Sequence, residues 1–249
     1  ERNPVRNYWG YEEGCYYVPK AAYSYSGDSV REFQDMVRQL HISGIEVIMQ
    51  FYFPAEMSRA EILEILRYWK LFYHVDGFRL LGVGIPASAF SEDALLCDSK
   101  IWYEAFEEEK NTGENLSYYK SDYLYTMRRF LKGDDGILEG ALYQMRYLPV
   151  KAGRVHYLTN YDGFTLMDMV SYGEKHNEAN GENNRDGNDY NCSWNCGEEG
   201  ATRREKIKKL RIRQIKNAIC LLLLSHSTPL IFMGDEFGNS QKGNNNPYC

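Results

Sequence analysis

Apolar residues along the chain follow two periods in turn, and this alternation gives the first view of the fold. In some segments they recur every three or four residues, the spacing of a helix with one buried face, and in others they form the short runs of a buried strand. The segments with helical spacing are 29–43, 58–73, 121–132 and 203–224. The strand-like runs are 45–51, 75–81, 100–104, 155–160 and 229–233. This alternation predicts an α/β fold with a parallel sheet.

Turn residues mark the ends of the first two predicted helices. Asp28 or Ser29 can accept a hydrogen bond as the N-cap of the first helix, and Gly44 can end it. Ser58 and Glu61 have the spacing of a capping box at the start of the second helix. We place no strand between the helix that ends near residue 132 and the strand that begins near residue 155.

Helix and strand units repeated this often suit either an eight-stranded (β/α) barrel or a doubly wound sheet. No Gly-x-Gly-x-x-Gly follows a predicted strand, which disfavours a dinucleotide-binding sheet. We therefore predict an α/β fold of the (β/α)8 TIM-barrel type, with residues 1–249 forming a single barrel domain. In such a barrel the chemistry lies where strands end. The strand ends are 50–54, 79–81, 104, 160–162 and 234–236.

The charge balance excludes some partners. The chain has 29 Lys and Arg against 35 Asp and Glu, a formal net charge of −6. Since phosphate backbones and anionic lipids repel such a chain, we expect neither a nucleic-acid partner nor a membrane partner. The N-terminal residues lack the basic-then-apolar pattern of a signal peptide, which favours a cytoplasmic location. Secretion is not excluded, because a trimmed chain would look the same.

The cysteines do not form a recognisable framework. Six of them are scattered over 249 residues, so we expect reduced thiols. Cys192 and Cys196 bracket three residues, but neither a second pair nor a histidine at ligand spacing accompanies them. We predict no metal and no cofactor.

Seven segments, several of them at or after predicted strand ends, carry distinctive runs of residues. They are 7–11, 75–79, 161–166, 175–187, 192–197, 234–238 and 243–246. Together they resemble the α-amylase superfamily of glycoside hydrolases, in particular its isoamylase and glycogen-debranching branch. The resemblance extends over most of the chain and implies a barrel that begins just before its second strand and ends just after its eighth. The first strand and last helix are then absent, as in a fragment of a longer chain or a shortened descendant.

The resemblance also implies a set of catalytic positions. Members of the family hydrolyse α-glucosidic bonds with retention, using a nucleophilic carboxylate and a carboxylic acid about 5 Å apart. Glu104 matches the acid, Asp162 matches the carboxylate that stabilises the transition state, and Arg79 matches the arginine that orients the nucleophile. The nucleophile position itself is occupied by Leu81, which cannot attack an anomeric carbon. Asp76 is no substitute, because it lies five residues earlier and so on the opposite face of the strand.

Other family positions have changed as well. The third-strand motif of the family lies at 50–55, where the sequence is Gln-Phe-Tyr-Phe-Pro-Ala and all three polar positions have changed. Tyr161 replaces the histidine before Asp162. The short stretch 57–73 leaves no room for the inserted second domain, which forms one wall of the family's cleft and holds most of its usual calcium site. The candidate substrate-binding residues at these family positions are Trp9, Tyr11, Tyr161, His176 and Asn177.

Structural roles compete with these functional ones. Glu104 can pair with Arg79 or face water, and Asp162 can cap a helix that starts near Phe164. Without its partner aspartate, Arg79 is expected to bond Glu104, Asp162 or solvent. The Asn-rich stretch 176–195 suits either sugar hydroxyls or a solvated loop.

The leading hypothesis is a catalytically impaired debranching-type homologue that binds an α-glucan or maltooligosaccharide or serves as a scaffold. One alternative is an active hydrolase that uses Glu104 and Asp162, and another is a structural or interaction module without sugar binding. An open barrel edge is costly in water, so we also expect self-association into a homo-oligomer.

Overall fold

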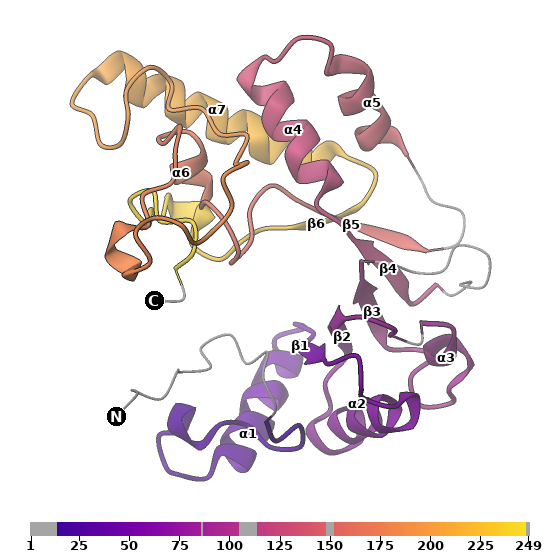
Figure 1. The fold of residues 1–249 in the computed structure, drawn as a ribbon. Coiled ribbons are helices and arrows are strands. Elements are labelled where there is room, and N and C mark those ends of the chain that lie inside the picture. Colours follow the sequence, from indigo (N-terminus) through magenta and orange to yellow (C-terminus); the bar gives the residue numbers. More distant parts are fainter. Residues whose placement is uncertain (1–13, 86, 105–113, 148–151, 248–249) are drawn as a thin grey trace. The chain divides into compact units, whose positions relative to one another are not determined.

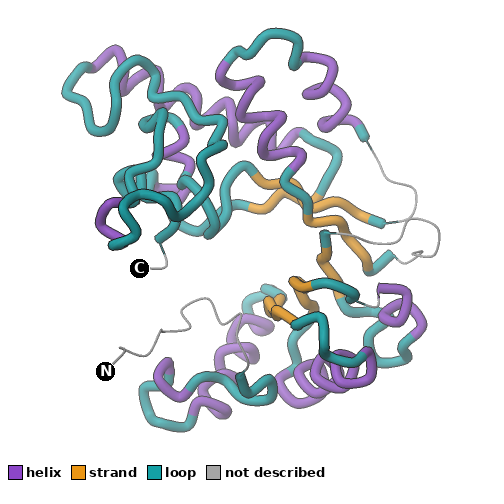
Figure 2. Tube along the Cα trace, in the orientation of Figure 1, coloured by secondary structure: helices purple, strands orange, loops and turns teal. Residues whose placement is uncertain are grey.

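The computed structural model describes residues 14–85, 87–104, 114–147 and 152–247 (Figure 1). The chain divides into two compact units. Unit 1 comprises Glu1–Tyr119 and Pro149–Gly153, and unit 2 comprises Lys120–Leu148 and Arg154–Cys249. Each unit contains both strands and helices (Figure 2). The predicted α/β class is confirmed.

Unit 1 is a parallel sheet with helices. Its strands are β1 (Ile48–Phe53), β2 (Gly77–Gly82), β3 (Lys100–Tyr103) and β4 (Leu116–Tyr119), and they pair side by side in that order. Its helices are η1 (Ala21–Tyr23), α1 (Ser29–Ile42), α2 (Arg59–Tyr73) and α3 (Ala87–Glu92). β1 and β2 are joined through α2, and β2 and β3 through α3, which is the expected βαβ arrangement.

The strands of unit 1 have one apolar face and one polar face. Phe51 and Phe53 of β1 and Phe78 and Leu80 of β2 are buried in the core that also contains α2 residues. The intervening side chains, such as that of Arg79, point to the opposite face, because successive side chains of a strand alternate. The alternation therefore separates packing from chemistry on the same strands.

The two predicted helix starts of unit 1 are confirmed. The Asp28 side chain accepts from the backbone N–H of Arg31, and Ser58 and Glu61 form the complete capping box. The two helices pack through aromatic contacts, with the Phe33 ring 5.3 Å from the Trp69 ring. The edge-to-face geometry of this pair adds to the area that both rings bury.

Unit 2 holds a second parallel pair of strands and most of the long loops. Its elements are α4 (Asp122–Lys132), α5 (Leu138–Arg146), β5 (Gly153–Tyr157), α6 (Leu166–Met169), η2 (Glu178–Asn180), α7 (Glu205–Leu224), β6 (Thr228–Leu230) and η3 (Asp235–Phe237). β5 pairs with β6. The core of unit 2 contains Tyr123, Met127, Phe164 and Ala218. Neither the 20-residue α7 nor any other described helix combines the length and apolarity that a membrane crossing requires.

Candidate functional site

The polar face of unit 1 brings three predicted strand ends into one row. In the parallel register Gln50 of β1 lies beside Arg79 of β2, and Arg79 lies beside Trp102 of β3. Two residues further on, Leu81 lies beside Tyr52. Glu104 follows directly after β3, two residues beyond Trp102. The register therefore places the candidate acid and the altered nucleophile position at the same end of neighbouring strands.

Arg79 contacts an amide on the neighbouring strand and an aromatic ring. Its Nη1 donates to Oε1 of Gln50 at 2.6 Å, and its guanidinium lies 3.8 Å from the centre of the Tyr119 ring. A cation over an aromatic face is attracted by the ring quadrupole. The expectation that Arg79 is satisfied by Glu104, Asp162 or solvent missed these two partners. Gln50 stands at one of the changed family positions.

Leu81 is held at the carboxyl end of β2 by its neighbours. Gly82, which follows it, has a φ of +123°, and a Cβ built there would lie 2.0 Å from the Phe53 carbonyl oxygen. The hydroxyl of Tyr103 donates to the Gly82 carbonyl at 3.0 Å. This close approach requires glycine at position 82, and the Tyr103 bond ties the end of β2 to β3.

Asp76 belongs to the opposite end of β2. Its Oδ2 accepts from the Val47 backbone N–H at 2.7 Å and lies 2.8 Å from Nε2 of His41. The carboxylate thus joins the start of the sheet to the end of α1. As the sequence indicates, it does not stand in for the missing nucleophile.

Glu104 is exposed at the end of β3. Trp102 of the same strand stacks on Tyr119 of β4, with 6.3 Å between ring centres. The polar face of unit 1 therefore presents an amide, a guanidinium, a carboxylate and aromatic rings. These are the groups that proteins use to bind sugar hydroxyls and sugar faces.

In unit 2 the loop from β5 to α6 carries Tyr161 and the exposed Asp162. The backbone N–H of Asp162 donates to Oδ1 of Asn160 at 3.0 Å, which forms the turn. Helix α6 is capped by Thr165, whose hydroxyl accepts from the Asp168 backbone N–H at 3.1 Å. The expectation that Asp162 caps this helix is therefore wrong, because Thr165 lies at the N-cap position. The carboxylate of Asp162 is not used in the cap.

Asn177 is completely buried, and each of its side-chain polar atoms is bonded within the protein. Its Nδ2 donates to the Asp186 carbonyl at 2.9 Å and to Oδ1 of Asn245 at 2.8 Å. Its Oδ1 accepts from the Asn245 backbone N–H at 2.9 Å. This position supports the loops rather than presenting its amide at the surface.

His176 lies half-buried beside Asn177. Its Nε2 is 3.1 Å from Oε1 of Glu199, and its ring meets the edge of Tyr172 with 5.3 Å between ring centres. Bonds from two backbone amides, an asparagine and His176 outweigh burial, so the pKa of Glu199 is lowered. Trp9 and Tyr11, the other predicted sugar contacts, lie outside the described residues.

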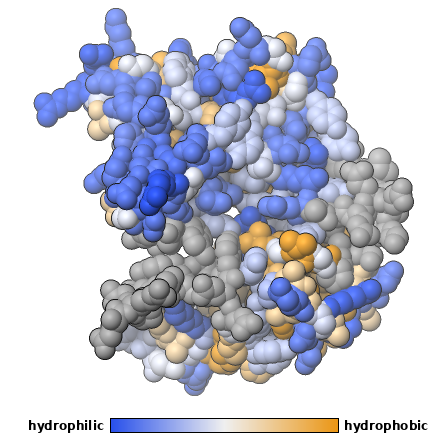
Figure 3. All heavy atoms as spheres, in the orientation of Figure 1, coloured by the Kyte–Doolittle hydropathy of each residue, from blue (hydrophilic) through white to orange (hydrophobic). Residues whose placement is uncertain are grey.

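The Asn-rich motifs form a cross-linked network between segments far apart in sequence. Asp186 accepts from Nδ2 of Asn180 at 2.7 Å and from Nδ2 of Asn246 at 2.9 Å. Asn245 donates to Oδ1 of Asn191 at 2.8 Å. The network explains why the motifs 175–187 and 243–246 occur together, which the sequence alone did not reveal. Hydrophilic residues dominate this part of the surface in Figure 3.

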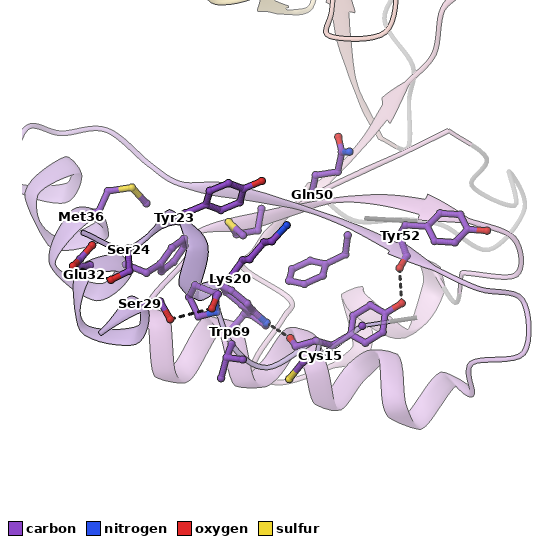
Figure 4. A pocket seen from close by; sticks show the side chains of 17 residues that line it. Cys15, Lys20, Tyr23, Ser24, Ser29, Glu32, Met36, Gln50, Tyr52 and Trp69 are labelled. Atoms are coloured by element: carbon purple, nitrogen blue, oxygen red, sulfur yellow. Dashed lines mark hydrogen bonds between the residues drawn. The ribbon is translucent and has the colours of Figure 1, made fainter. Parts of the chain in front are cut away.

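A cavity of about 600 Å³ lies in unit 1 between α1, β1 and the segment that begins at Gly14 (Figure 4). Its lining is largely apolar, with Phe33, Met36 and Trp69 among its residues. Gln50 also borders it, but in Figure 4 the amide of Gln50 points away from the other lining side chains. The cavity therefore meets the polar face of unit 1 at its rim.

The described residues contain no group of three or more His, Cys, Asp or Glu that could hold a metal ion. Cys192 and Cys196 are both free thiols with left-handed backbone conformations, φ of +51° and +59°.

No protein-family model matches this chain, but several curated proteins are similar to it over nearly its whole length. A glycogen operon protein GlgX homolog of Mycobacterium tuberculosis is 33% identical over 98% of this chain and 44% of its own length. A glycogen debranching enzyme of Erwinia tasmaniensis is 32% identical over 98% of this chain and 48% of its own. Chloroplastic isoamylase 1 of Oryza sativa is 30% identical over 98% and 42%.

The chain spans less than half the length of these relatives. The alignment with the mycobacterial protein has 322 positions against 249 residues in this chain, so at least 73 positions of the relative have no counterpart here.

Solved structures agree on the fold. A pullulanase from GBS, in complex with maltotetraose, has a TM-score of 0.68 and 15% identity, covering 93% of this chain and 37% of that one. A variant of AmyP in complex with maltotriose has a TM-score of 0.60 and 14% identity, covering 98% and 56%. At this identity they show a shared fold of the amylase-type barrel. The chain is therefore a homologue of the isoamylases and glycogen-debranching enzymes, the branch of the α-amylase superfamily that its motifs resemble.

Proposed function

We propose that this chain is an α-glucan-binding homologue of the debranching enzymes that does not form the family's covalent glucosyl intermediate. The observation that carries the proposal is Leu81, at the carboxyl end of β2 beside Tyr52. A retaining glycosidase needs a carboxylate there, about 5 Å from its acid, to form the ester. An isobutyl side chain supplies neither a nucleophile nor a negative charge for an oxocarbenium ion.

The changes around Leu81 support the proposal. An orienting arginine is useful to a retaining enzyme because it fixes the nucleophilic carboxylate. Here Arg79 donates to the amide of Gln50. Asp76, five residues before Leu81, is engaged at the other end of the strand. Asp76 therefore does not place a carboxylate at the position of Leu81.

Binding of a glucan is supported by the groups that remain. Arg79, Trp102 and Glu104 share one end of the unit 1 sheet, and Asp162 is exposed in unit 2. The relatives are named for glycogen debranching, and two of the similar structures are complexes with maltooligosaccharides. A cytoplasmic location beside a glycogen-like polymer is part of the same proposal.

Two measurements with one ligand series test the proposal. With glycogen, pullulan and maltoheptaose, we expect no protein-dependent reducing ends, while calorimetry with maltoheptaose gives a saturable heat of binding. The comparison variant is Glu104→Gln. It is expected to leave the yield of reducing ends at zero and to weaken maltoheptaose binding by no more than about tenfold, the effect of losing one hydrogen bond.

The outcomes separate the candidate functions. Turnover that Glu104→Gln abolishes would contradict the proposal and support a hydrolase that uses Glu104 and Asp162. Absence of both turnover and binding would instead support a structural or interaction module.

A further inference from the structure

One buried carboxylate in unit 2 holds both ends of the loop that carries Asp162. Asp235 lies in η3 and is 4% exposed. Its Oδ1 accepts from the Leu166 backbone N–H at 2.8 Å, and its Oδ2 accepts from the hydroxyl of Thr159. Thr159 and Leu166 flank Tyr161 and Asp162, so one side chain spans the base of this loop.

The turn that contains Asp235 is built to aim this carboxylate inward. Gly234 has a φ of +105°, and a Cβ there would lie 2.9 Å from the Cβ of Asn239. The next acidic residue, Glu236, is exposed and accepts from the Gly234 backbone N–H at 2.8 Å. Glu236 therefore closes its own turn, and Asp235 reaches the loop.

A buried arginine reinforces the same loop base. Arg128 donates through Nε and Nη2 to the Leu158 carbonyl, at 2.9 and 2.7 Å. Burial raises the pKa of Asp235, while its hydrogen bonds and the charge of Arg128 act in the opposite direction. Hydrogen bonds with Arg128 and Asp235 thus fix the chain on both sides of the loop, at residues 158, 159 and 166. Only the short stretch between 159 and 166 can still change its conformation.

We infer that Asp235 is a positioning residue, which holds Tyr161 and Asp162 in the conformation that meets an α-glucan. The ligand in this inference rests on the proposed function. Fixing a loop before binding removes part of the entropy that the ligand would otherwise have to offset. The role of Asp235 is thus exerted through the loop, without contact between Asp235 and the sugar.

The test compares Asp235→Ala with Asp235→Asn in the full chain. Alanine removes both bonds, whereas asparagine can accept from Leu166 through Oδ1 and donate to Thr159 through Nδ2. Thr159→Val, which removes one of the two bonds, is the milder second variant. The control is Asp93→Ala in unit 1, where a carboxylate 7% exposed accepts from Arg67 and from backbone N–H groups.

Hydrogen exchange of residues 159–166 is measured without ligand, and maltoheptaose binding is measured by calorimetry. We expect Asp235→Ala to speed exchange at Leu166 by about ten- to a hundredfold, the effect of losing one hydrogen bond to a charged group. Binding should weaken by a similar factor. Thr159→Val should have a smaller effect on both exchange and binding. Asp235→Asn should restore most of the protection from exchange and most of the affinity. Asp93→Ala should leave the loop protected.

The two ideas fail in different ways. Unchanged exchange in folded Asp235→Ala or Thr159→Val, or equal loop exchange in Asp93→Ala, would overturn the positioning role. Lack of rescue by a folded Asp235→Asn would do the same. Absence of maltoheptaose binding by the unmodified chain would overturn the proposed function, and the exchange data would still decide whether Asp235 holds the loop.

Discussion

Replacing Arg128 by methionine is expected to lower the free energy of unfolding by about 3 kcal/mol, because it leaves two buried carbonyl groups without their donor. Arg128 is 4% exposed and donates to the carbonyls of Leu158 and Asn191. Burial lowers its pKa to about 10, so the guanidinium is still charged at neutral pH. The variant keeps much of the apolar volume and removes the donors. Urea denaturation followed by fluorescence measures the change.

Arg129 provides a matched control on the same helix. It bonds Asp134 at 3.0 Å at the surface, with 39% of its side chain exposed. A surface pair of this kind contributes less than about 1 kcal/mol, so Arg129→Met should be nearly neutral. If Arg128→Met were as stable as the wild type, the free-energy cost of burying the charge would equal the free energy gained from its hydrogen bonds. Arg128 would then make no net contribution to stability.

Acid should destabilise the protein through His156, by about 3 kcal/mol between pH 6.5 and pH 4. His156 is 2% exposed and stacks on Tyr123 with 4.1 Å between ring centres, and burial lowers its pKa from 6.5 to about 4. A lowered pKa means that the unfolded chain takes up the proton first. The contribution is therefore complete above pH 6.5 and is lost as the pH falls toward 4.

The comparison that isolates this effect is with His156→Phe, which keeps a ring against Tyr123 and cannot be protonated. Burial raises the pKa of Asp168 and of Asp235, and these carboxyls change stability in the opposite direction over part of the same range. The free energy of unfolding of the wild type minus that of His156→Phe should thus fall by about 3 kcal/mol as the pH is lowered from 6.5 to 4. His226→Gln, at an exposed site, serves as the control. A constant difference across the range would show that His156 titrates alike in both states.

Much of the fold could be predicted from local signals. The capping box at Ser58 and the helical apolar spacing that follows it locate α2 correctly, and the run 75–81 locates β2 to within two residues at its start. The segment 116–119 was missed as a strand, because its four residues contain a single aliphatic side chain. Helix α5 was missed between 132 and 154, since its amphipathic pattern is short and begins without a side-chain cap.

The site was less predictable, because its key contacts join residues far apart in sequence. The sequence identified Leu81 as an altered position, but it did not indicate that Gln50 would bond Arg79 from the neighbouring strand. Nor did it reveal that Asn177 is buried against Asn245, 68 residues away. Long-range pairing of amides leaves no period or spacing in a sequence. The joint presence of the two Asn-rich motifs was the one signal of it.

The most direct test of the central claim is covalent trapping with an activated fluorinated α-glucosyl donor, read by intact-mass spectrometry. Because Leu81 cannot form the ester, we expect no sugar adduct on the wild-type chain under conditions that label an active debranching enzyme. A stoichiometric adduct on the wild-type chain, mapped to a carboxylate, would contradict this expectation.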